Sequence, residues 1–152
     1  MQLKTLAASS RPAFLLLTLA SVFLGYAAAR LATDVVDTRL LLPVLAGALS
    51  AHASANLLNE YFDFSSGLDL LTRRTPFSGG SGALPADPDS AAAVMMLGFS
   101  MLAISIATGL YLVRAVGPGI LLVGIPGVVL VAAYTQWLTR RPWLCLVAPG
   151  LA

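Results

Sequence analysis

Four long runs of apolar residues, separated by polar segments, make up most of the sequence. The runs cover about residues 13–29, 40–63, 91–113 and 119–138. A helix needs roughly 20 mostly apolar residues to cross about 30 Å of hydrocarbon, so each run predicts a transmembrane helix. A fifth apolar run, which starts near Trp143, ends at Ala152 and is too short to span. We therefore expect an all-α, polytopic transmembrane helix bundle with four complete spans plus the start of a fifth, and interpret residues 1–152 as the truncated N-terminal part of one domain.

The composition agrees with a membrane protein. Of the 152 residues, 58% are hydrophobic and 11% are charged, whereas soluble proteins carry about 25% charged residues. Disorder is excluded, because a disordered chain combines low hydrophobicity with high charge. The net charge of +2 comes from Lys and Arg at the ends of the apolar runs. Such positions are typical of topology signals rather than of a basic nucleic-acid surface, so we expect no nucleic-acid partner.

The Lys and Arg residues also predict an orientation. Six of them fall on one side of the predicted spans, and Arg30, Arg39 and Arg114 fall on the other. Cytoplasmic loops carry the excess of Lys and Arg, so the N-terminus and the loop 64–90 are expected in the cytoplasm. The expected location is a bacterial inner (plasma) membrane. The first run could instead be a signal peptide, but the further apolar runs that follow it favour a span.

A stripe of polar side chains interrupts the second predicted span. At 100° per residue, five of them share an arc of about 100° on one helix face. They are His52, Asn56, Asn59, Glu60 and Asp63. A charged side chain at mid-bilayer costs roughly 2.5–3.5 kcal/mol, so the acids are expected near the membrane rim and facing the bundle interior or a wet cavity. The histidine is better explained as a hydrogen-bond link between helices than as a ligand, and for the first asparagine the two explanations are equally good.

Asp69 lies beyond this stripe. Continuing the helix would put it on another face, so we expect Gly67 to end the helix in a left-handed conformation and let Asp69 fold back over the cluster. Glu60 and Asp63 are three residues apart, which puts their Cβ atoms about 5–6 Å from each other. Two carboxylates that close are unfavourable unless a cation or a shared proton lies between them.

Carboxylates, an amide and two arginines together suit a phosphate site. Magnesium prefers one or two carboxylates, several waters and phosphate oxygens. Arg73 and Arg74 could clamp further phosphate oxygens, although ordinary anchoring at the cytoplasmic side explains them equally well. The glycine-rich segment 78–82 could supply backbone N–H groups. A site of this kind at a membrane rim suits a lipid diphosphate whose tail stays in the bilayer.

The run Asn59-Glu60-Tyr61-Phe62-Asp63, followed by Gly67-Leu68-Asp69, resembles the first aspartate-rich motif of the UbiA-type intramembrane aromatic prenyltransferases. The spacing is most similar to the branch that prenylates 1,4-dihydroxy-2-naphthoate, and residues 74–82 are similar to a loop of bacterial members. The resemblance implies that Asn59, Asp63 and Asp69 hold Mg²⁺, with Asp63 and Asp69 as catalytic residues. It also implies that Asn59 and Arg73 or Arg74 contact the diphosphate. Glu60 stands where the family usually has an aspartate and is a further candidate metal ligand.

The resemblance covers the N-terminal half of the family domain, and the family's second aspartate-rich motif is absent from the chain. We therefore predict part of a membrane prenyltransferase, with the fragment inactive by itself. The intact enzyme would move a polyprenyl group from its diphosphate to an aromatic acceptor in menaquinone or ubiquinone biosynthesis, with Mg²⁺ assisting departure of the diphosphate. A segment of a cation- or proton-coupled transporter stays open as an alternative, because Glu60 and Asp63 alone would suffice for it.

Overall fold

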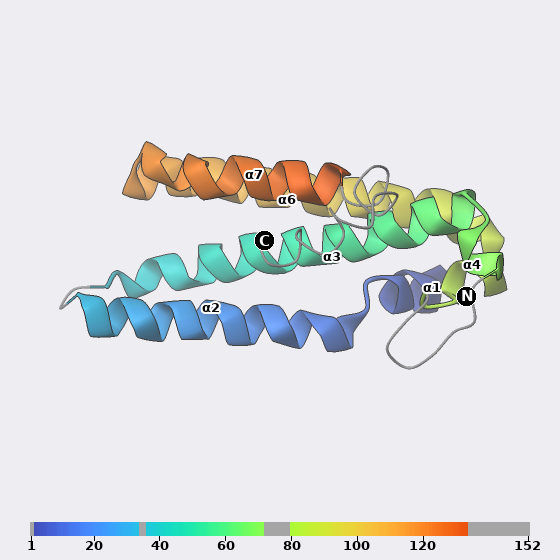
Figure 1. Cartoon of the computed structure of the whole chain (residues 1–152), viewed down its shortest axis with the longest axis horizontal. Coiled ribbons are helices and arrows are strands. Elements are labelled where there is room, and N and C mark those ends of the chain that lie inside the picture. Colours follow the sequence, from blue (N-terminus) through green and yellow to red (C-terminus); the bar gives the residue numbers. More distant parts are fainter. Residues whose placement is uncertain (1, 34–35, 72–79, 134–152) are drawn as a thin grey trace.

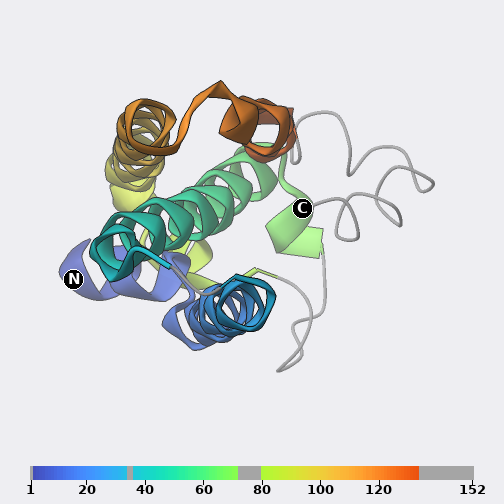
Figure 2. The same ribbon diagram turned by 90° about the vertical axis from the view of Figure 1, so that its left-hand side faces the viewer.

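The computed structural model describes residues 2–33, 36–71 and 80–133. Within these residues the chain forms helices joined by turns, and no strand occurs there. The three long helices are α2 (Pro12–Ala32), α3 (Leu41–Ser65) and α6 (Ala91–Val116). Figures 1 and 2 show α3 in the middle, with α2 packed on one side of it and α6 on the other. The expected helical bundle is therefore confirmed for the described part of the chain.

Among the described residues, three segments are long and apolar enough to cross a membrane: Pro12–Ala32, Thr38–Ser65 and Pro88–Val116. They match the first three predicted spans and extend each of them by a few residues. The fourth predicted run begins with a 3-10 turn, η3 (Pro118–Ile120), and continues as the shorter apolar helix α7 (Leu121–Ala133). The rest of that run and the fifth apolar run lie outside the described residues.

Local chemistry explains where the long helices begin and end. Pro12 occupies the first turn of α2, where a missing N–H costs nothing. Helix α3 follows the 3-10 turn η1 (Thr38–Leu40), in which the Asp37 side chain caps the turn by accepting a hydrogen bond from the Arg39 N–H. After α3, Gly67 has φ +79°, a left-handed conformation that glycine adopts without a steric penalty. The expected helix stop at Gly67 is thus confirmed.

The sequence pattern did not predict a helix before the first span. Helix α1 (Gln2–Ser9) lies at the same end of the bundle as α4 (Leu68–Leu71), and the α2–α3 turn lies at the other end (Figure 1). Its Thr5 hydroxyl donates a hydrogen bond of 2.7 Å to Asp87 Oδ2, and the Ser90 hydroxyl donates to the same oxygen at 2.7 Å. These two hydrogen bonds lower the pKa of the Asp87 carboxyl. Asp87 therefore joins the N-terminal helix to the start of α6.

The segment between α3 and α6 is partly helical. Besides α4, it contains α5 (Ala83–Ala86) and the 3-10 turn η2 (Pro88–Ser90) directly before α6. Leu84 of α5 is fully buried against Leu57 of α3 and Val94 of α6. The buried apolar cluster therefore lies at the α1–α4 end of the bundle and holds the loop segment close to the last turns of α3.

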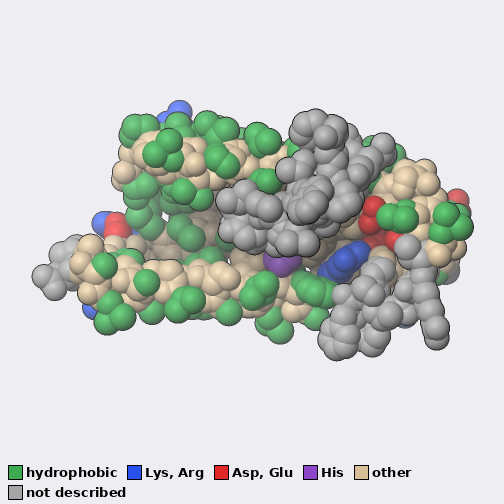
Figure 3. All heavy atoms as spheres, in the orientation of Figure 1, with side chains coloured by type: hydrophobic (Ala, Val, Ile, Leu, Met, Phe, Trp, Pro, Cys, Tyr) green, Lys and Arg blue, Asp and Glu red, His purple; other side chains and the backbone are tan. Residues whose placement is uncertain are grey.

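Apolar side chains line the outer edges of the bundle that are visible in Figure 3, and the visible charged groups lie mainly toward its two ends. Exposed Leu16, Leu17 and Leu24 on α2 are examples of this outer surface. Such a surface is expected where lipid is the solvent. Helices α3 and α6 approach closely at Gly98, because a Cβ there would lie 2.8 Å from Leu58 Cδ2. Small residues allow this kind of close packing between membrane helices.

Candidate functional site

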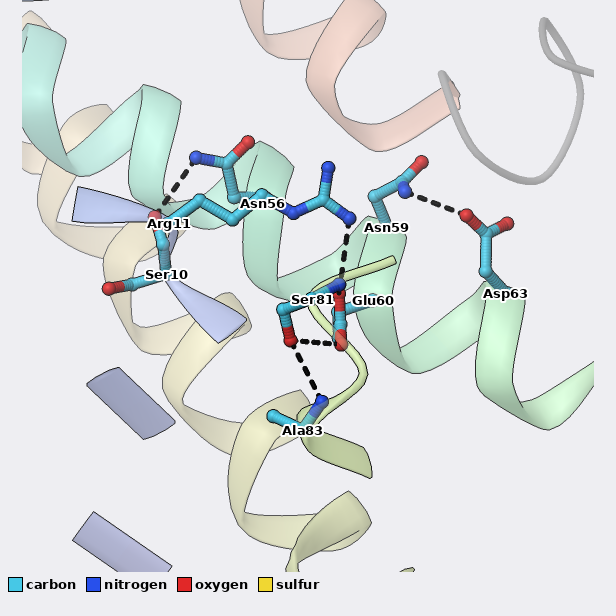
Figure 4. A network of polar contacts seen from close by, with 8 residues as sticks. All are labelled: Ser10, Arg11, Asn56, Asn59, Glu60, Asp63, Ser81 and Ala83. Carbon is cyan, nitrogen blue, oxygen red and sulfur yellow. Dashed lines mark hydrogen bonds and ion pairs between the residues drawn. The ribbon is translucent and has the colours of Figure 1, made fainter. Parts of the chain in front are cut away.

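Asn59 and Asp63 face each other on successive turns near the end of α3. The Asn59 amide donates from Nδ2 to Asp63 Oδ2 over 2.7 Å. Residues four apart on a helix are neighbours, so the spacing alone brings the two side chains together. Figure 4 shows both of them on one side of α3, turned toward each other. Both residues are only partly buried, so the pair stays accessible at the end of the helix.

Asp69 joins the same end of the molecule through the turn after α3. The Gly67 N–H donates to the Phe64 carbonyl and the Gly67 carbonyl accepts from Leu70, so the turn leads directly into α4. Asp69, in the first turn of α4, is 7% exposed and lies close enough to Asp63 for their charges to repel. The expectation that Asp69 returns to the polar cluster is therefore confirmed.

Gly80 packs directly against the Asp69 carboxylate. A Cβ built on Gly80 would lie 2.6 Å from both Asp69 carboxylate oxygens. That distance is well inside van der Waals contact, so no residue with a side chain fits there without displacing Asp69. Gly80, where the described chain resumes after α4, thus forms one wall of the acid cluster. The predicted phosphate contacts Arg73 and Arg74 lie outside the described residues.

Glu60 has a different environment from its two acidic neighbours. It is fully buried, and its Oε2 accepts from Arg11 Nη2 at 3.1 Å and from the Ser81 backbone N–H at 2.9 Å. Its Oε1 accepts from the Ser81 hydroxyl. In Figure 4 the Glu60 side chain points toward the segment at Ser81, whereas Asp63 points to the side of Asn59. The cation required beside a pair of acids is supplied here by the guanidinium of Arg11.

Arg11 is the functional neighbour that sequence reasoning missed. Its position before the first span was explained by topology, and nothing in the local pattern links it to α3. Its backbone is left-handed, with φ +51°, where the chain turns from α1 into α2. The signal that could have found it is physical: a buried carboxylate requires a cationic partner, and an arginine at the same membrane rim is a candidate.

The two remaining polar residues of the stripe link helices. The Thr18 hydroxyl of α2 and His52 Nδ1 of α3 are 2.6 Å apart and hydrogen-bonded. Asn56 Nδ2 donates to the Ser10 carbonyl, at the corner between α1 and α2, over 3.0 Å. The interpretation of His52 and Asn56 as hydrogen-bond links is confirmed. The polar stripe therefore divides into residues that join α3 to α2 or to the α1–α2 corner and residues that lie at the acid cluster near the end of α3.

The residues of the acid cluster have the donor atoms that magnesium prefers. Asn59, Asp63 and Asp69 combine an amide oxygen with two neighbouring carboxylates, and Mg²⁺ typically takes one or two carboxylates while keeping waters and phosphate oxygens. In the part of the chain that the structure describes, no three His, Cys, Asp or Glu side chains form a complete protein cage for a metal. An ion held here would therefore need oxygen ligands from elsewhere, as a diphosphate or water provides.

The known proteins and the family model that match this chain all belong to one group. A stretch of 52 residues is 44% identical to "UbiA prenyltransferase domain-containing protein 1" of Mus musculus, and covers 34% of this chain and 16% of that protein. The Rattus norvegicus protein of the same name is also 44% identical over 52 residues, which is 15% of its length. No solved structure matches the chain. The model of the UbiA prenyltransferase family matches residues 18–152. Since this match covers most of the chain, the protein belongs to the UbiA prenyltransferase family.

Proposed function

We propose that this protein is, or is part of, a membrane prenyltransferase that moves a polyprenyl group from its diphosphate to an aromatic quinone precursor. Family membership supports the reaction class, and the aspartate spacing favours 1,4-dihydroxy-2-naphthoate as the acceptor. The single observation that carries the site is the meeting of Asn59, Asp63 and Asp69 at one end of the apolar bundle. Asp63 and Asp69 are the proposed catalytic residues.

The charges of the cluster explain why a diphosphate and a divalent cation suit it. Asp63 and Asp69 repel each other, so the pair is stabilised when a cation lies between them. When bound, Mg²⁺ would neutralise the diphosphate and make it a better leaving group. The exposed apolar side chains of α2 and α6 suit contact with the prenyl tail of the same substrate.

The residues of the chain have distinct proposed tasks. The Asn59 amide holds the Asp63 carboxylate in one orientation through their 2.7 Å hydrogen bond, and Asn59 also contacts the diphosphate. Arg73 and Arg74 are proposed to bind the outer phosphate oxygens. In the reaction, the carbon–oxygen bond to the diphosphate breaks, a carbon–carbon bond to the aromatic ring forms, and the ring carbon loses a proton. Binding of the prenyl diphosphate and the aromatic acceptor at one site would hold their reacting atoms together.

The orientation and the location are also proposals. The apolar spans and the family support an integral membrane protein. The excess of Lys and Arg supports a cytoplasmic N-terminus and a cytoplasmic segment 64–90, in a bacterial plasma membrane. The transporter alternative is not proposed, because no observation in the described residues favours it and Glu60 is engaged by Arg11.

The test is a transfer assay on the full-length protein in lipid vesicles. A polyprenyl diphosphate is supplied with 1,4-dihydroxy-2-naphthoate or 4-hydroxybenzoate, and both the prenylated product and released diphosphate are measured with Mg²⁺ and with a chelator. We expect product with one of the acceptors, lost on chelation and restored by Mg²⁺. Absence of product with every aromatic acceptor, together with cation flux that needs no prenyl diphosphate, would refute the proposed function.

A further inference from the structure

We propose that Glu60 is a positioning residue that acts on Asp69 through Ser81 and Gly80, rather than a ligand of the metal. This inference rests on the proposed function, because it assigns Glu60 the task of shaping the diphosphate site. Three observations support it: the contacts of Glu60, the contact between Gly80 and Asp69, and the direct chain connection between Gly80 and Ser81.

Both carboxylate oxygens of Glu60 already have hydrogen-bond donors, which disfavours their binding to a metal. The side chain is fully buried, and both of its oxygens accept hydrogen bonds. Oε2 accepts from Arg11 and from the Ser81 backbone, and Oε1 accepts from the Ser81 hydroxyl. Metal ligation would require breaking these bonds and uncovering the carboxylate. A buried carboxylate with several donors is instead well suited to hold a backbone segment in place.

The segment that Glu60 holds is the one that packs on Asp69. Ser81 donates twice to Glu60, and Gly80 is the preceding residue. The backbone of Gly80 lies so close to Asp69 that an added Cβ would be 2.6 Å from both carboxylate oxygens. The Ser81 hydroxyl also accepts from the Ala83 N–H at 3.0 Å, which ties the same segment to α5. Moving Ser81 would therefore move the wall that defines where the Asp69 carboxylate sits.

A neighbouring positive charge allows Glu60 to hold the Ser81 segment while it is buried. The guanidinium of Arg11 lies 3.1 Å from Oε2 and compensates the negative charge. The longer side chain of glutamate reaches away from Asp63 toward Ser81, as Figure 4 shows. Partners that orient metal ligands from behind typically change metal affinity by about 10–100-fold when removed. An effect of that size is the expected signature of Glu60.

The experiment measures metal binding without turnover. Mn²⁺ serves as a spectroscopically visible substitute for Mg²⁺, and its binding to the full-length protein is followed by electron paramagnetic resonance with inorganic pyrophosphate present. The variants are Glu60→Gln, which removes the charge, and Gly80→Ala, which adds a Cβ against Asp69. Gly25→Ala in α2 is the matched control, because a Cβ there meets nothing within 4 Å.

A double-mutant cycle separates positioning from general stability. We expect E60Q and G80A each to weaken Mn²⁺ binding by about tenfold or more, and G25A to leave it unchanged. Because Glu60 acts through Asp69, E60Q should add little to the loss already caused by Asp69→Asn. Wild-type Mn²⁺ affinity in E60Q, or fully additive losses in the double variant, would overturn the inference.

A second pair of variants covers the case in which E60Q does not fold. Ser81→Ala removes the hydroxyl bonds to Glu60 and Ala83 but keeps the backbone bond to Glu60, and it should weaken Mn²⁺ binding. Ser81→Thr keeps a hydroxyl and should bind Mn²⁺ as the wild type does. Equal affinity in S81A and the wild type would also overturn the inference. Failure of the proposed function gives a different result: the wild-type protein itself would then show no pyrophosphate-dependent Mn²⁺ binding.

Discussion

Arg11 and Glu60 are 49 residues apart in the sequence, yet the guanidinium of Arg11 lies 3.1 Å from the Glu60 carboxylate. Glu60 is fully buried, and the Arg11 side chain is 22% exposed. The pair joins the corner between α1 and α2 to the last turns of α3. The two acids therefore have different partners, since Glu60 is paired with Arg11 and Asp63 accepts a hydrogen bond from Asn59.

Breaking this ion pair should destabilise the protein strongly. Arg11→Ala leaves the buried Glu60 carboxylate without its cation, which typically costs about 3–5 kcal/mol. Thermal unfolding in detergent measures the loss. Arg39→Ala is the matched control: Arg39 pairs with Asp37 at 3.0 Å, but its side chain is 89% exposed, so solvent screens the pair and its loss should leave the unfolding midpoint nearly unchanged. Similar effects of the two substitutions would contradict the structural role of the Arg11–Glu60 pair.

Removing either proposed catalytic acid should abolish Mg²⁺-dependent transfer. Asp63→Asn and Asp69→Asn keep the size of the side chain but remove the charge that a divalent cation requires. We expect a loss of about 100-fold or more in turnover, measured as product formed in the vesicle assay.

Asp37→Asn is the control for these two substitutions. Asp37 is an acid at the opposite end of α3, where it caps η1 and pairs with Arg39. Its substitution should leave turnover near that of the wild type. Near-normal turnover in both D63N and D69N would rule out the site assignment.

The attachment of α1 should depend on pH through Asp87. Hydrogen bonds from the Thr5 and Ser90 hydroxyls lower the pKa of this carboxyl below its usual value of 3.8. A lowered pKa in the folded state stabilises the protein above the usual value, and that stabilisation is lost as the pH falls through the lowered value. We therefore expect α1 to stay attached at neutral pH and to loosen in acid below about pH 4.

Hydrogen exchange of the α1 amides at several pH values tests this attachment. Asp87→Asn should weaken the protection of α1 near neutral pH and remove its pH dependence in acid. Asp89→Asn is the control, because Asp89 is exposed two residues away. Unchanged α1 protection in D87N would show that other contacts, such as those with α5, hold the helix.

Gly98 should tolerate substitution far less than Gly109 on the same helix. A Cβ at Gly98 would lie 2.8 Å from Leu58 Cδ2 and 3.3 Å from Leu57 Cβ, whereas a Cβ at Gly109 would meet nothing within 4 Å. Gly98→Ala should therefore destabilise the α3–α6 contact by about 1–3 kcal/mol. Gly109→Ala should be neutral or stabilise by up to about 1 kcal/mol. The midpoints of thermal unfolding compare the two; a larger loss for G109A would contradict the packing of α3 on α6.

Much of the fold follows from local features that a single sequence carries. Apolar runs of about 20 residues predict spans because only a continuous helix satisfies its backbone inside lipid. The helix ends are equally local, since Gly67 supplies a left-handed stop by its own chemistry. The meeting of Asn59 and Asp63 also follows from helical spacing. These parts of the prediction needed no knowledge of the rest of the chain.

By itself, then, the sequence determined the spans, the polar stripe on α3 and the resemblance to a prenyltransferase motif. Only the tertiary structure decided which polar residues of the stripe link helices and which lie at the acid cluster. Glu60 accepts hydrogen bonds from Arg11 and Ser81, and Asp87 accepts one from Thr5, which is far from it in the sequence. The periodicity of apolar and polar residues cannot predict such pairs, because they depend on how helices distant in the sequence pack together. A buried charge shows that a partner must exist, but only packing selects which one.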